Sequence, residues 1–443
     1  MKKTNTILID LTKKYLFPQK ISTIYYKGLI LIISDETARW LVLNNDKQLE
    51  FFDLLKKNNI SDSLAKFDGP ETDAKNVIMQ IEAKHFESDF VRKFNGGNRL
   101  HIYLTNECNL RCPHCYMFAG NKIENELNTD EIYLLLRNFK NFGGASITLS
   151  GGEVCTRLDL FDIVQFAKSI GLEVQILTNG TLWNDEQINK ISPFLHDVQI
   201  SIDGYNEEEN AKIRGKGNYE KALHSLDLFV KNNVKAEVAI TPIYNDKLES
   251  QIEKYICFGK YLISKYEGKD FKIKFSGSLF DGRSVKLNEK EREKYKQLAE
   301  QMYIGCYNID SDTLFVNARR NDEVLDNCAY GELVVNANGD IYLCAQIQFL
   351  KPIGNVRIDK WEEICKLAKR GHYLSNINNL KPCNMCELKY ICGGGCRLLN
   401  SKDLINANLR DNHKSIQFNT ECPQGLKESV YDLMIRTNTR IFQ

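Results

Sequence analysis

The sequence predicts an α/β fold: a partial barrel of six strand–helix units, preceded by a winged-helix-like domain and followed by a cysteine-rich domain. Three observations carry this prediction. At 443 residues the chain exceeds a single ordinary core. Strand and helix patterns alternate between residues 100 and 275, as parallel strands with crossover helices require. Cysteines are absent before residue 108 and crowd into residues 328–422. We expect domains at residues 1–90, 91–285 and 286–443.

The composition limits the function classes. A net charge of +1 does not favour capture of nucleic acid or of an anionic membrane. No apolar run approaches the roughly 18–20 residues of a membrane span, and charged residues interrupt the N-terminal apolar stretch before a secretory core forms. We therefore expect a cytoplasmic protein. In a long cytosolic chain, 14 clustered cysteines are more often metal ligands than disulfides.

The N-terminal region begins with β-branched and aromatic residues over 21–34. A turn signal at Asp35-Glu36 and a second strand at 39–43 complete a predicted β-hairpin. Helical patterns follow from Asn45-Asp46 and over 60–67 and 71–84. A hairpin with three helices indicates a small winged-helix-like domain, either a structural cap or a nucleic-acid-binding module. Its helices carry as many acids as bases, which disfavours nucleic acid.

From residue 100 onward, strands and helices alternate. We predict strands at 100–105, 146–149, 173–178, 197–202, 235–240 and 271–275. Helical patterns lie between them at 129–141, 157–170, 184–192, 218–232 and 247–267. In such a barrel the chemistry collects at the C-terminal ends of the strands. The informative residues of this sequence fall there.

Three cysteines, Cys108, Cys112 and Cys115, follow the first of these strands with the spacing Cys-x₃-Cys-x₂-Cys. Three thiolates leave one iron of a [4Fe–4S] cube without a protein ligand. A cluster with an open iron can bind a small molecule and pass it an electron. A zinc site with one further ligand is the alternative, but zinc does not explain the polar residues at the next strand ends.

Short polar residues and glycines follow the next three strands. Ser150-Gly151-Gly152-Glu153 lets the backbone approach a ligand and offers a carboxylate to an ammonium group. Thr178-Asn179-Gly180 and Ser201-Ile202-Asp203 carry side chains that can hold ribose hydroxyls. Arg214 can meet a carboxylate.

The ordered set Cys-x₃-Cys-x₂-Cys, Gly-Gly-Glu and Ser-x-Asp-Gly, over residues 99–280, resembles the radical S-adenosylmethionine (SAM) enzymes. The resemblance implies that the open iron binds the amino and carboxylate groups of SAM. One electron from an external donor, such as flavodoxin or ferredoxin, then cleaves SAM to methionine and a 5′-deoxyadenosyl radical. The implied contacts to SAM or its cluster come from His114, Tyr116, Gly151, Gly152, Glu153, Asn179, Ser201, Asp203 and Arg214.

Within that set, Gly151, Gly152 and Glu153 would hold the methionyl ammonium. Ser201 and Asp203 would serve the ribose, and Arg214 the carboxylate. His114 and Tyr116 occupy places beside the cluster that an imidazole or aromatic ring often fills. Where the family commonly has proline after Gly-Gly-Glu, this chain has Val154-Cys155.

The C-terminal region carries a charged helical pattern at 288–304 and a hairpin over 331–344 with an Asn-Gly turn. Seven cysteines follow a regular spacing: Cys328, Cys344, Cys383, Cys386, Cys392, Cys396 and Cys422. This spacing resembles the SPASM domain of peptide-modifying radical SAM enzymes, which holds two auxiliary [4Fe–4S] clusters. The resemblance assigns one cluster to Cys383, Cys386, Cys392 and Cys422, and the other to Cys328, Cys344 and Cys396. A zinc ribbon over 383–396 is the alternative, but it leaves Cys328, Cys344 and Cys422 unused.

The cluster at Cys328 lacks a fourth ligand in this assignment. Family members such as sulfatase maturases carry a further cysteine six residues before it, where this chain has Asp322. Cys306 can supply the bond from further away, or the site stays open for a substrate thiolate.

The order and size of the N-terminal elements resemble the precursor-peptide recognition domain of many peptide-modifying enzymes. In that family the leader of the substrate peptide adds a strand to the edge of the sheet. Together these features predict a radical SAM/SPASM peptide maturase with three [4Fe–4S] clusters. Its N-terminal domain would hold the leader while the barrel abstracts hydrogen from the core peptide. The auxiliary clusters would accept the second electron, which gives a thioether or carbon–carbon cross-link.

Three alternatives stay open. A peptide epimerase would need a cysteine to return a hydrogen atom, and Cys155 and Cys306 are the candidate catalytic residues. A sulfatase-type formylglycine maturase is disfavoured, because Ala345 stands where that group has an aspartate. A non-catalytic, metal-stabilised peptide-binding protein is the third.

Overall fold

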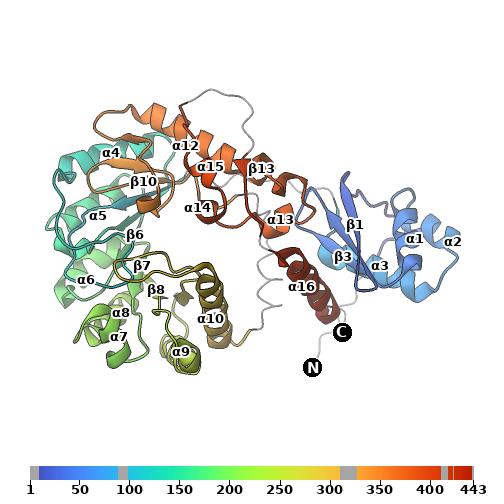
Figure 1. Ribbon diagram of the computed structural model, residues 1–443, viewed down its shortest axis with the longest axis horizontal. Coiled ribbons are helices and arrows are strands. Elements are labelled where there is room, and N and C mark those ends of the chain that lie inside the picture. Colours follow the sequence, from blue (N-terminus) through green and yellow to red (C-terminus); the bar gives the residue numbers. More distant parts are fainter. Residues whose placement is uncertain (1–8, 88–97, 310–326, 411–417, 423, 442–443) are drawn as a thin grey trace.

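The computed structural model describes residues 9–87, 98–309, 327–410, 418–422 and 424–441. A nine-stranded, mostly parallel sheet forms its centre, and a three-stranded sheet lies to one side (Figure 1). Within the described ranges, no helix is long and apolar enough to span a membrane. Asp322 and the predicted domain boundary after residue 90 lie outside the described residues.

The small N-terminal sheet has three antiparallel strands, β1 (Ile21–Tyr26), β2 (Leu29–Ser34) and β3 (Trp40–Leu43). The prediction of one continuous strand over 21–34 is therefore wrong. Lys27 and Gly28 have φ values of 49° and 76°, and two consecutive positive values make the tight turn that folds this segment back. Lys-Gly lacks the Asn or Asp that usually marks such a turn, so the pattern did not reveal it.

Three helices follow at the predicted places: α1 (Asp46–Leu55), α2 (Ile60–Lys66) and α3 (Glu71–Lys84). The side chains of Asn45 and Asn59 accept backbone N–H groups and so cap α1 and α2. One face of the small sheet packs on these helices. The buried side chains between them include Ile30, Ile32, Leu41, Leu43, Phe51 and Phe52.

The opposite face of the small sheet packs against the C-terminal part of the chain. One buried cluster joins its residues Leu31, Ile33, Trp40 and Val42 to Ile377, Leu388, Tyr390, Ile391, Tyr431 and Met434. Tyr431 and Met434 belong to the C-terminal helix α16 (Leu426–Ile441), which lies beside the small sheet (Figure 1). Because both faces of the sheet are covered, β2 and β3 are apolar at almost every position.

The central sheet has the strand order β12-β11-β10-β4-β5-β6-β7-β8-β9. Six parallel strands confirm the predicted partial barrel: β4 (Arg99–Tyr103), β5 (Ser146–Ser150), β6 (Glu173–Thr178), β7 (Asp197–Ser201), β8 (Lys235–Ile240) and β9 (Phe271–Phe275). The predicted hairpin is present as β10 (Leu333–Val335) and β11 (Asp340–Tyr342). Since β10 pairs in parallel with β4, the C-terminal region and the barrel share one sheet, which ends at β12 (Gly354–Asn355).

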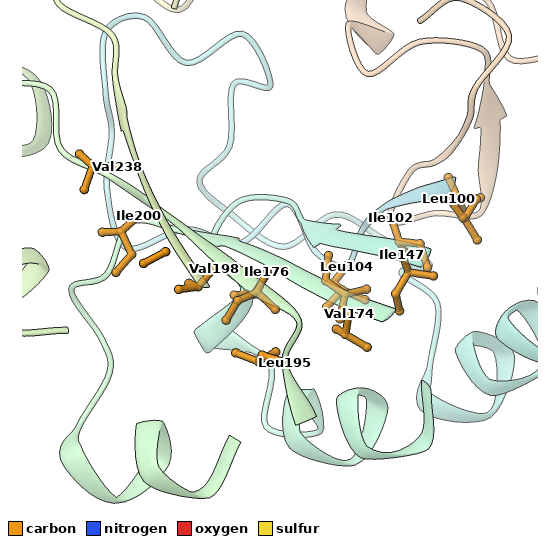
Figure 2. Packing of buried hydrophobic residues seen from close by; sticks show 14 of the residues in the cluster. Leu100, Ile102, Leu104, Ile147, Val174, Ile176, Leu195, Val198, Ile200 and Val238 are labelled. Carbon is orange, nitrogen blue, oxygen red and sulfur yellow. The ribbon is translucent and has the colours of Figure 1, made fainter. Parts of the chain in front are cut away.

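Helices cover the outer face of this sheet: α4 (Thr129–Asn141), α5 (Leu160–Ser169), α6 (Asp185–Ile191), α7 (Glu207–Arg214), α8 (Tyr219–Lys231), α9 (Leu248–Lys265) and α10 (Glu289–Tyr307). Only α7 was not predicted, because its buried residues are just Asn210 and Ile213 and form no apolar stripe. Alternate strand residues such as Ile176 and Val198 point toward the helices (Figure 2). The intervening residues face the inside of the barrel.

Short elements make up most of the C-terminal region around α12 (Trp361–Ser375). They are β13 (Leu380–Lys381), α13 (Lys389–Cys392), α14 (Arg397–Asn400), α15 (Lys402–Ile405) and β14 (Phe418–Asn419). Single 3₁₀ turns lie at Val154–Thr156 (η1), Ser192–Phe194 (η2), Ile347–Phe349 (η3), Ile377–Asn379 (η4) and Cys383–Met385 (η5). The buried Arg397 guanidinium donates to the carbonyls of Ser375, Gly393 and Gly395, and so fixes the cysteine-bearing segment to α12.

Two methionines test whether α16 holds the N-terminal sheet in place. Met434 is 0% exposed in the shared cluster, whereas Met79 on α3 is 46% exposed. Met434→Ala should lower the free energy of unfolding by about 2–5 kcal/mol because it removes a buried side chain. Met79→Ala, the matched control, should change it by less than about 0.5 kcal/mol. Urea denaturation of the full chain measures both, and equal effects would contradict the packing role of α16.

Candidate active site

The cysteine loop follows β4 and closes on itself. The Cys108 N–H donates to the Gly120 carbonyl (3.0 Å), and the Gly120 N–H donates to the Asn106 carbonyl (2.8 Å). Inside this loop the Cys115 N–H donates to the Cys112 carbonyl (3.2 Å). The three predicted thiols therefore lie on one closed loop at the C-terminal end of β4.

A second loop, which follows β9, supports the cysteine loop. The Ser284 N–H donates to the Pro113 carbonyl (2.9 Å), and the Arg283 guanidinium donates to the Ala119 carbonyl (2.6 Å). A Cβ at Gly282 would overlap the backbone of His114, so only glycine allows this close approach.

The environment of the thiols fits a metal cluster. Burial raises the pKa of the Cys108 thiol to about 11 and also raises the pKa of Cys112. Without a bound cation these groups stay protonated at neutral pH, whereas a metal holds them as thiolates. No three His, Cys, Asp or Glu side chains of the described residues converge closely enough for a single ion. A four-iron cube separates its thiolates further than one zinc ion, which binds sulfur at about 2.3 Å.

Glu153 is buried and held by its neighbours. Its carboxylate, in a residue only 1% exposed, accepts from the Thr178 hydroxyl (2.5 Å), the Asn179 N–H (2.7 Å) and the Cys155 N–H (3.2 Å). Burial raises its pKa, and these hydrogen bonds oppose the rise. A carboxylate has roughly four acceptor positions. The Cys155 side chain is a further hydrogen-bond partner of this carboxylate, so an ammonium group that binds Glu153 would take the place of the Cys155 thiol.

Gly151 and Gly152 press against the loop that follows β4. The Gly152 N–H donates to the Thr105 carbonyl (2.7 Å), and the Glu153 N–H donates to the Glu107 carbonyl (2.8 Å). A Cβ at Gly151 or Gly152 would overlap one of these carbonyls. The packing of the two loops requires both glycines, independently of any ligand.

Asn179 connects the end of β6 to the cysteine loop. Its side-chain amide donates to Asn109 Oδ1 (2.9 Å), and its Oδ1 accepts from the Thr181 N–H (2.9 Å). Asn109 in turn donates to the Thr181 hydroxyl (2.9 Å). Asn109 lies inside the cysteine motif, but sequence reasoning missed it because nothing local identifies the partner of a loop asparagine.

Asp203 is fully buried and pairs with Arg214. Its Oδ2 lies 2.7 Å from Arg214 Nε and 3.4 Å from His114 Nε2, and its Oδ1 accepts from the Thr241 N–H (2.8 Å). Arg214 Nε thus already pairs with a carboxylate of its own chain, and a contact between Arg214 and SAM stays a prediction. Asp203 pairs with Nε of Arg214, and no described residue forms a hydrogen bond with the two terminal nitrogens of that guanidinium. Ser201, also predicted as a ribose contact, is half-buried at the end of β7.

Tyr116 links the cysteine loop to the C-terminal region. Its hydroxyl lies 3.1 Å from the Tyr103 hydroxyl, which donates to the Ala345 carbonyl (2.5 Å). Tyr116 follows Cys115 and Ala345 follows Cys344. Through Tyr103, two hydrogen bonds therefore connect the residue after Cys115 with the residue after Cys344, and both cysteines are predicted cluster ligands.

The C-terminal cysteines gather in two groups. Burial raises the pKa of Cys344 to about 11, and the neighbouring thiols that raise it further are Cys328 and Cys396. Burial likewise raises the pKa of Cys383 to about 11, with contributions from Cys392, Cys386 and Cys422. The groups have the same members as the two predicted cluster sites, and metal binding there stays a prediction.

Cys306 and Cys155 lie in different surroundings. Cys306 is buried on α10 with its Sγ 3.7 Å from the Ile256 carbonyl oxygen of α9, and burial raises its pKa to about 12. It packs opposite Gly259, so its position does not support the expectation that it completes the Cys328 site. Cys155 lies in η1 beside Glu153, and burial followed by that carboxylate raises its pKa, which keeps it a thiol.

The inside of the barrel is a polar cavity of about 570 Å³. Its lining includes Tyr116, Cys344 and Ala345 at the cysteine side, and the charged residues Arg99, Glu173, Asp197, Lys235, Glu237 and Lys272. His101 also lines it, with an Nε2 that no described residue contacts by hydrogen bond, and burial lowers its pKa to about 4. Sequence reasoning missed His101. The alternation of Leu100 and Ile102 with His101 and Tyr103 was the signal for an inward polar side chain.

Comparisons with known proteins identify the family. Residues 102–256 match the model of the radical SAM superfamily. The Fe-coproporphyrin III synthase of Methanosarcina barkeri is 34% identical over 330 residues, which cover 67% of this chain and 82% of that protein. The chain belongs to the radical SAM superfamily. It is therefore an enzyme, and membership implies a [4Fe–4S] cluster and SAM.

Other radical SAM proteins resemble the chain more distantly. The sporulation killing factor maturation protein SkfB of Bacillus subtilis is 25% identical over 293 residues, or 65% of this chain and 69% of SkfB. Streptococcus suis SuiB bound to S-adenosylmethionine superposes with a TM-score of 0.52 at 17% identity, covering 87% of this chain and 96% of SuiB. SuiB has also been solved with its precursor peptide SuiA. At this identity the SuiB structures show the fold alone.

Glu153→Gln tests the buried carboxylate of this radical SAM site. The backbone N–H and hydroxyl groups around it donate, so a glutamine NH₂ would face a donor and leave that donor without an acceptor. We expect a loss of about 1–3 kcal/mol in the free energy of unfolding. Glu107→Gln, on an exposed residue of the adjoining loop, is the matched control and should have little effect. Equal stabilities by chemical denaturation would contradict the role of Glu153.

Proposed function

We propose that this radical SAM enzyme oxidises a ribosomally made precursor peptide and leaves a thioether or carbon–carbon cross-link in it. The observation that carries the proposal is the packing of the N-terminal sheet on the segment with Cys383, Cys386 and Cys392. The C-terminal region also shares a sheet with the barrel. A peptide bound to this winged-helix-like domain would therefore be held by a domain that packs against the rest of the enzyme. The names of SkfB, a maturation protein, and of SuiB with its precursor peptide support a peptide substrate.

In this proposal the three groups of cysteines hold three [4Fe–4S] clusters. Cys108, Cys112 and Cys115 hold the cluster that binds SAM, and the two C-terminal groups hold auxiliary clusters. When bound and reduced by an external donor such as flavodoxin or ferredoxin, the first cluster supplies the electron that cleaves SAM to methionine and a 5′-deoxyadenosyl radical.

Residues at the strand ends hold SAM in this proposal. The Glu153 carboxylate, beside Gly151 and Gly152, receives the methionyl ammonium in place of the Cys155 thiol. The terminal nitrogens of Arg214, whose charge acts on Cys112, take the carboxylate. Ser201 and Asn179 serve the ribose. Asp203 acts by holding Arg214 in place.

The cavity suits a peptide. A peptide backbone that leaves water needs hydrogen-bond partners, and the barrel offers polar groups such as Gln175, Gln199 and His101. His101 is neutral at pH 7, since burial lowers its pKa to about 4, and a neutral imidazole can accept a proton from the substrate.

A tetrapyrrole substrate is the second candidate function. The specific observation in its favour is the 34% identity to the Fe-coproporphyrin III synthase. That similarity covers 67% of this chain.

The test uses the full-length enzyme, reconstituted with iron and sulfide under anaerobic conditions. It is incubated with SAM, dithionite and each peptide encoded by the short open reading frames beside its gene. Mass spectrometry should show the loss of two hydrogens from one peptide, because a cross-link removes one hydrogen from each joined atom.

Cys112→Ala is the control and should abolish both SAM cleavage and the mass change. Deuterium uptake from heavy water without mass loss would indicate an epimerase instead. Turnover of an iron tetrapyrrole, with no change in any adjacent peptide, would contradict the proposal.

A further inference from the structure

The first turn of α16 lies beside the segment that carries Cys386. Lys427, the second residue of this helix, pairs with Glu387, the residue after Cys386. We infer that the Lys427 ammonium raises the reduction potential of the iron–sulfur cluster at Cys386, and that Glu387 and Tyr431 hold the ammonium in place. The inference rests on the proposed function, which assigns a [4Fe–4S] cluster to the group of cysteines that includes Cys386.

Glu387 fixes the position of the Lys427 ammonium. Lys427 Nζ lies 3.1 Å from Glu387 Oε1 and 3.0 Å from Oε2. The Tyr431 hydroxyl, one turn further along α16, donates to the same Oε1. The Glu387 side chain is only 13% exposed, so water competes weakly for these donors. Two side chains of α16 are therefore fastened to the residue that follows Cys386.

The Lys427 ammonium also reaches the sulfur of Cys386. The Lys427 side chain is a hydrogen-bond donor to Cys386 as well as to Glu387. Burial raises the pKa of the Cys386 thiol, the Glu387 carboxylate raises it further, and the Lys427 ammonium opposes the rise. Lys427 and Glu387 thus act on this sulfur with opposite signs.

A positive charge beside a ligand sulfur favours the reduced form of a cluster. One-electron reduction adds a negative charge to a [4Fe–4S] cluster, and a neighbouring ammonium attracts that charge. A hydrogen bond to a ligand sulfur acts in the same direction. Lys427 therefore makes the Cys386 site a better electron acceptor.

The proposed cross-linking reaction needs such an acceptor. The first hydrogen leaves the peptide as an atom and converts the 5′-deoxyadenosyl radical to 5′-deoxyadenosine. The second leaves as a proton, released to solvent, and an electron. The Cys386 site takes this electron, so the loss of two hydrogens from the peptide is balanced.

The N-terminal sheet supports α16 in this position. The Tyr26 ring at the end of β1 lies 5.2 Å from the Tyr431 ring. Lys27, the next residue, pairs with Asp432 at 2.7 Å. The helix that provides Lys427 is thus packed between the N-terminal sheet and the cysteine-bearing segment.

The test is a redox titration of the full-length, anaerobically reconstituted protein, followed by EPR spectroscopy. The couple of the Cys386 site is the one that disappears in Cys386→Ala. Lys427→Met should lower the midpoint potential of this couple. We expect a shift of about tenfold in the reduction equilibrium, which is ~59 mV for a one-electron couple. Lys427→Arg keeps the charge and should restore most of the original potential.

Lys389→Met is the matched control. Lys389 stands three residues after Cys386, but its ammonium lies over the Tyr390 ring, 5.1 Å from the ring centroid. Losing this charge should change the same equilibrium by less than about twofold, because the Lys389 ammonium makes its contact with the ring.

Glu387→Gln separates the effect of charge from that of structural support. It removes a negative charge beside Cys386 and keeps one side-chain oxygen for Lys427, so the midpoint potential should rise. A purely structural role of this contact would move the potential in the same direction in Glu387→Gln and Lys427→Met. If Lys427→Met does not fold, the direction of the shift in Glu387→Gln decides the matter.

A couple that depends on Cys386 but is unmoved in Lys427→Met, or moves equally in Lys389→Met, would overturn the inference. If no couple depends on Cys386, the cluster assignment is wrong and the inference fails with it. The titration uses dithionite and no peptide. A failed cross-linking assay beside the expected shifts would therefore reject the peptide chemistry alone.

Discussion

A buried carboxylate joins three loops at the carboxyl edge of the central sheet. Glu153 follows β5, accepts hydrogen bonds from residues at the end of β6, and bonds through its N–H to the loop after β4. Burying a charge is unfavourable unless hydrogen bonds compensate it, so this arrangement of the loops stabilises the buried carboxylate. The closed cysteine loop and its Asn109–Asn179 contact depend on that arrangement. The same edge holds the Asp203–Arg214 pair, which brings a guanidinium into the electrostatic range of Cys112.

The rest of the molecule is tied to this edge by two shared structures. β10 adds the C-terminal hairpin to the barrel sheet beside β4, and the Tyr116–Tyr103–Ala345 hydrogen bonds continue the connection next to Cys344. The small N-terminal sheet buries one face on its own helices and the other on the segment with Cys383, Cys386 and Cys392. A sheet covered on both faces offers only its edges to a partner. The small N-terminal sheet is therefore part of the folded unit that holds the strand-end residues of this radical SAM chain.

Local patterns in the sequence were enough to predict the six barrel strands and to single out the polar residues that follow them. Strand periodicity is a short-range property, and parallel strands bring their C-terminal ends together without further information. The Lys27–Gly28 turn was missed because its residue pair is an uncommon one for that geometry. The pairing of Asp203 with Arg214, the Asn109 contact and the unpartnered His101 nitrogen could not be predicted, since each depends on side chains that meet only in the folded chain. The packing of Leu31, Ile33 and Trp40 on α16 was hidden for the same reason.

The proposed function requires three separate iron–sulfur cluster sites in one chain, of which the site at Cys108, Cys112 and Cys115 would cleave SAM. Iron and sulfide analysis of the anaerobically reconstituted protein, combined with assay of 5′-deoxyadenosine, tests it most directly. The account predicts about 12 irons per chain, and about 8 irons with no SAM cleavage for Cys112→Ala. Roughly two to four irons per chain, zinc alone, or SAM cleavage that survives in Cys112→Ala would contradict it.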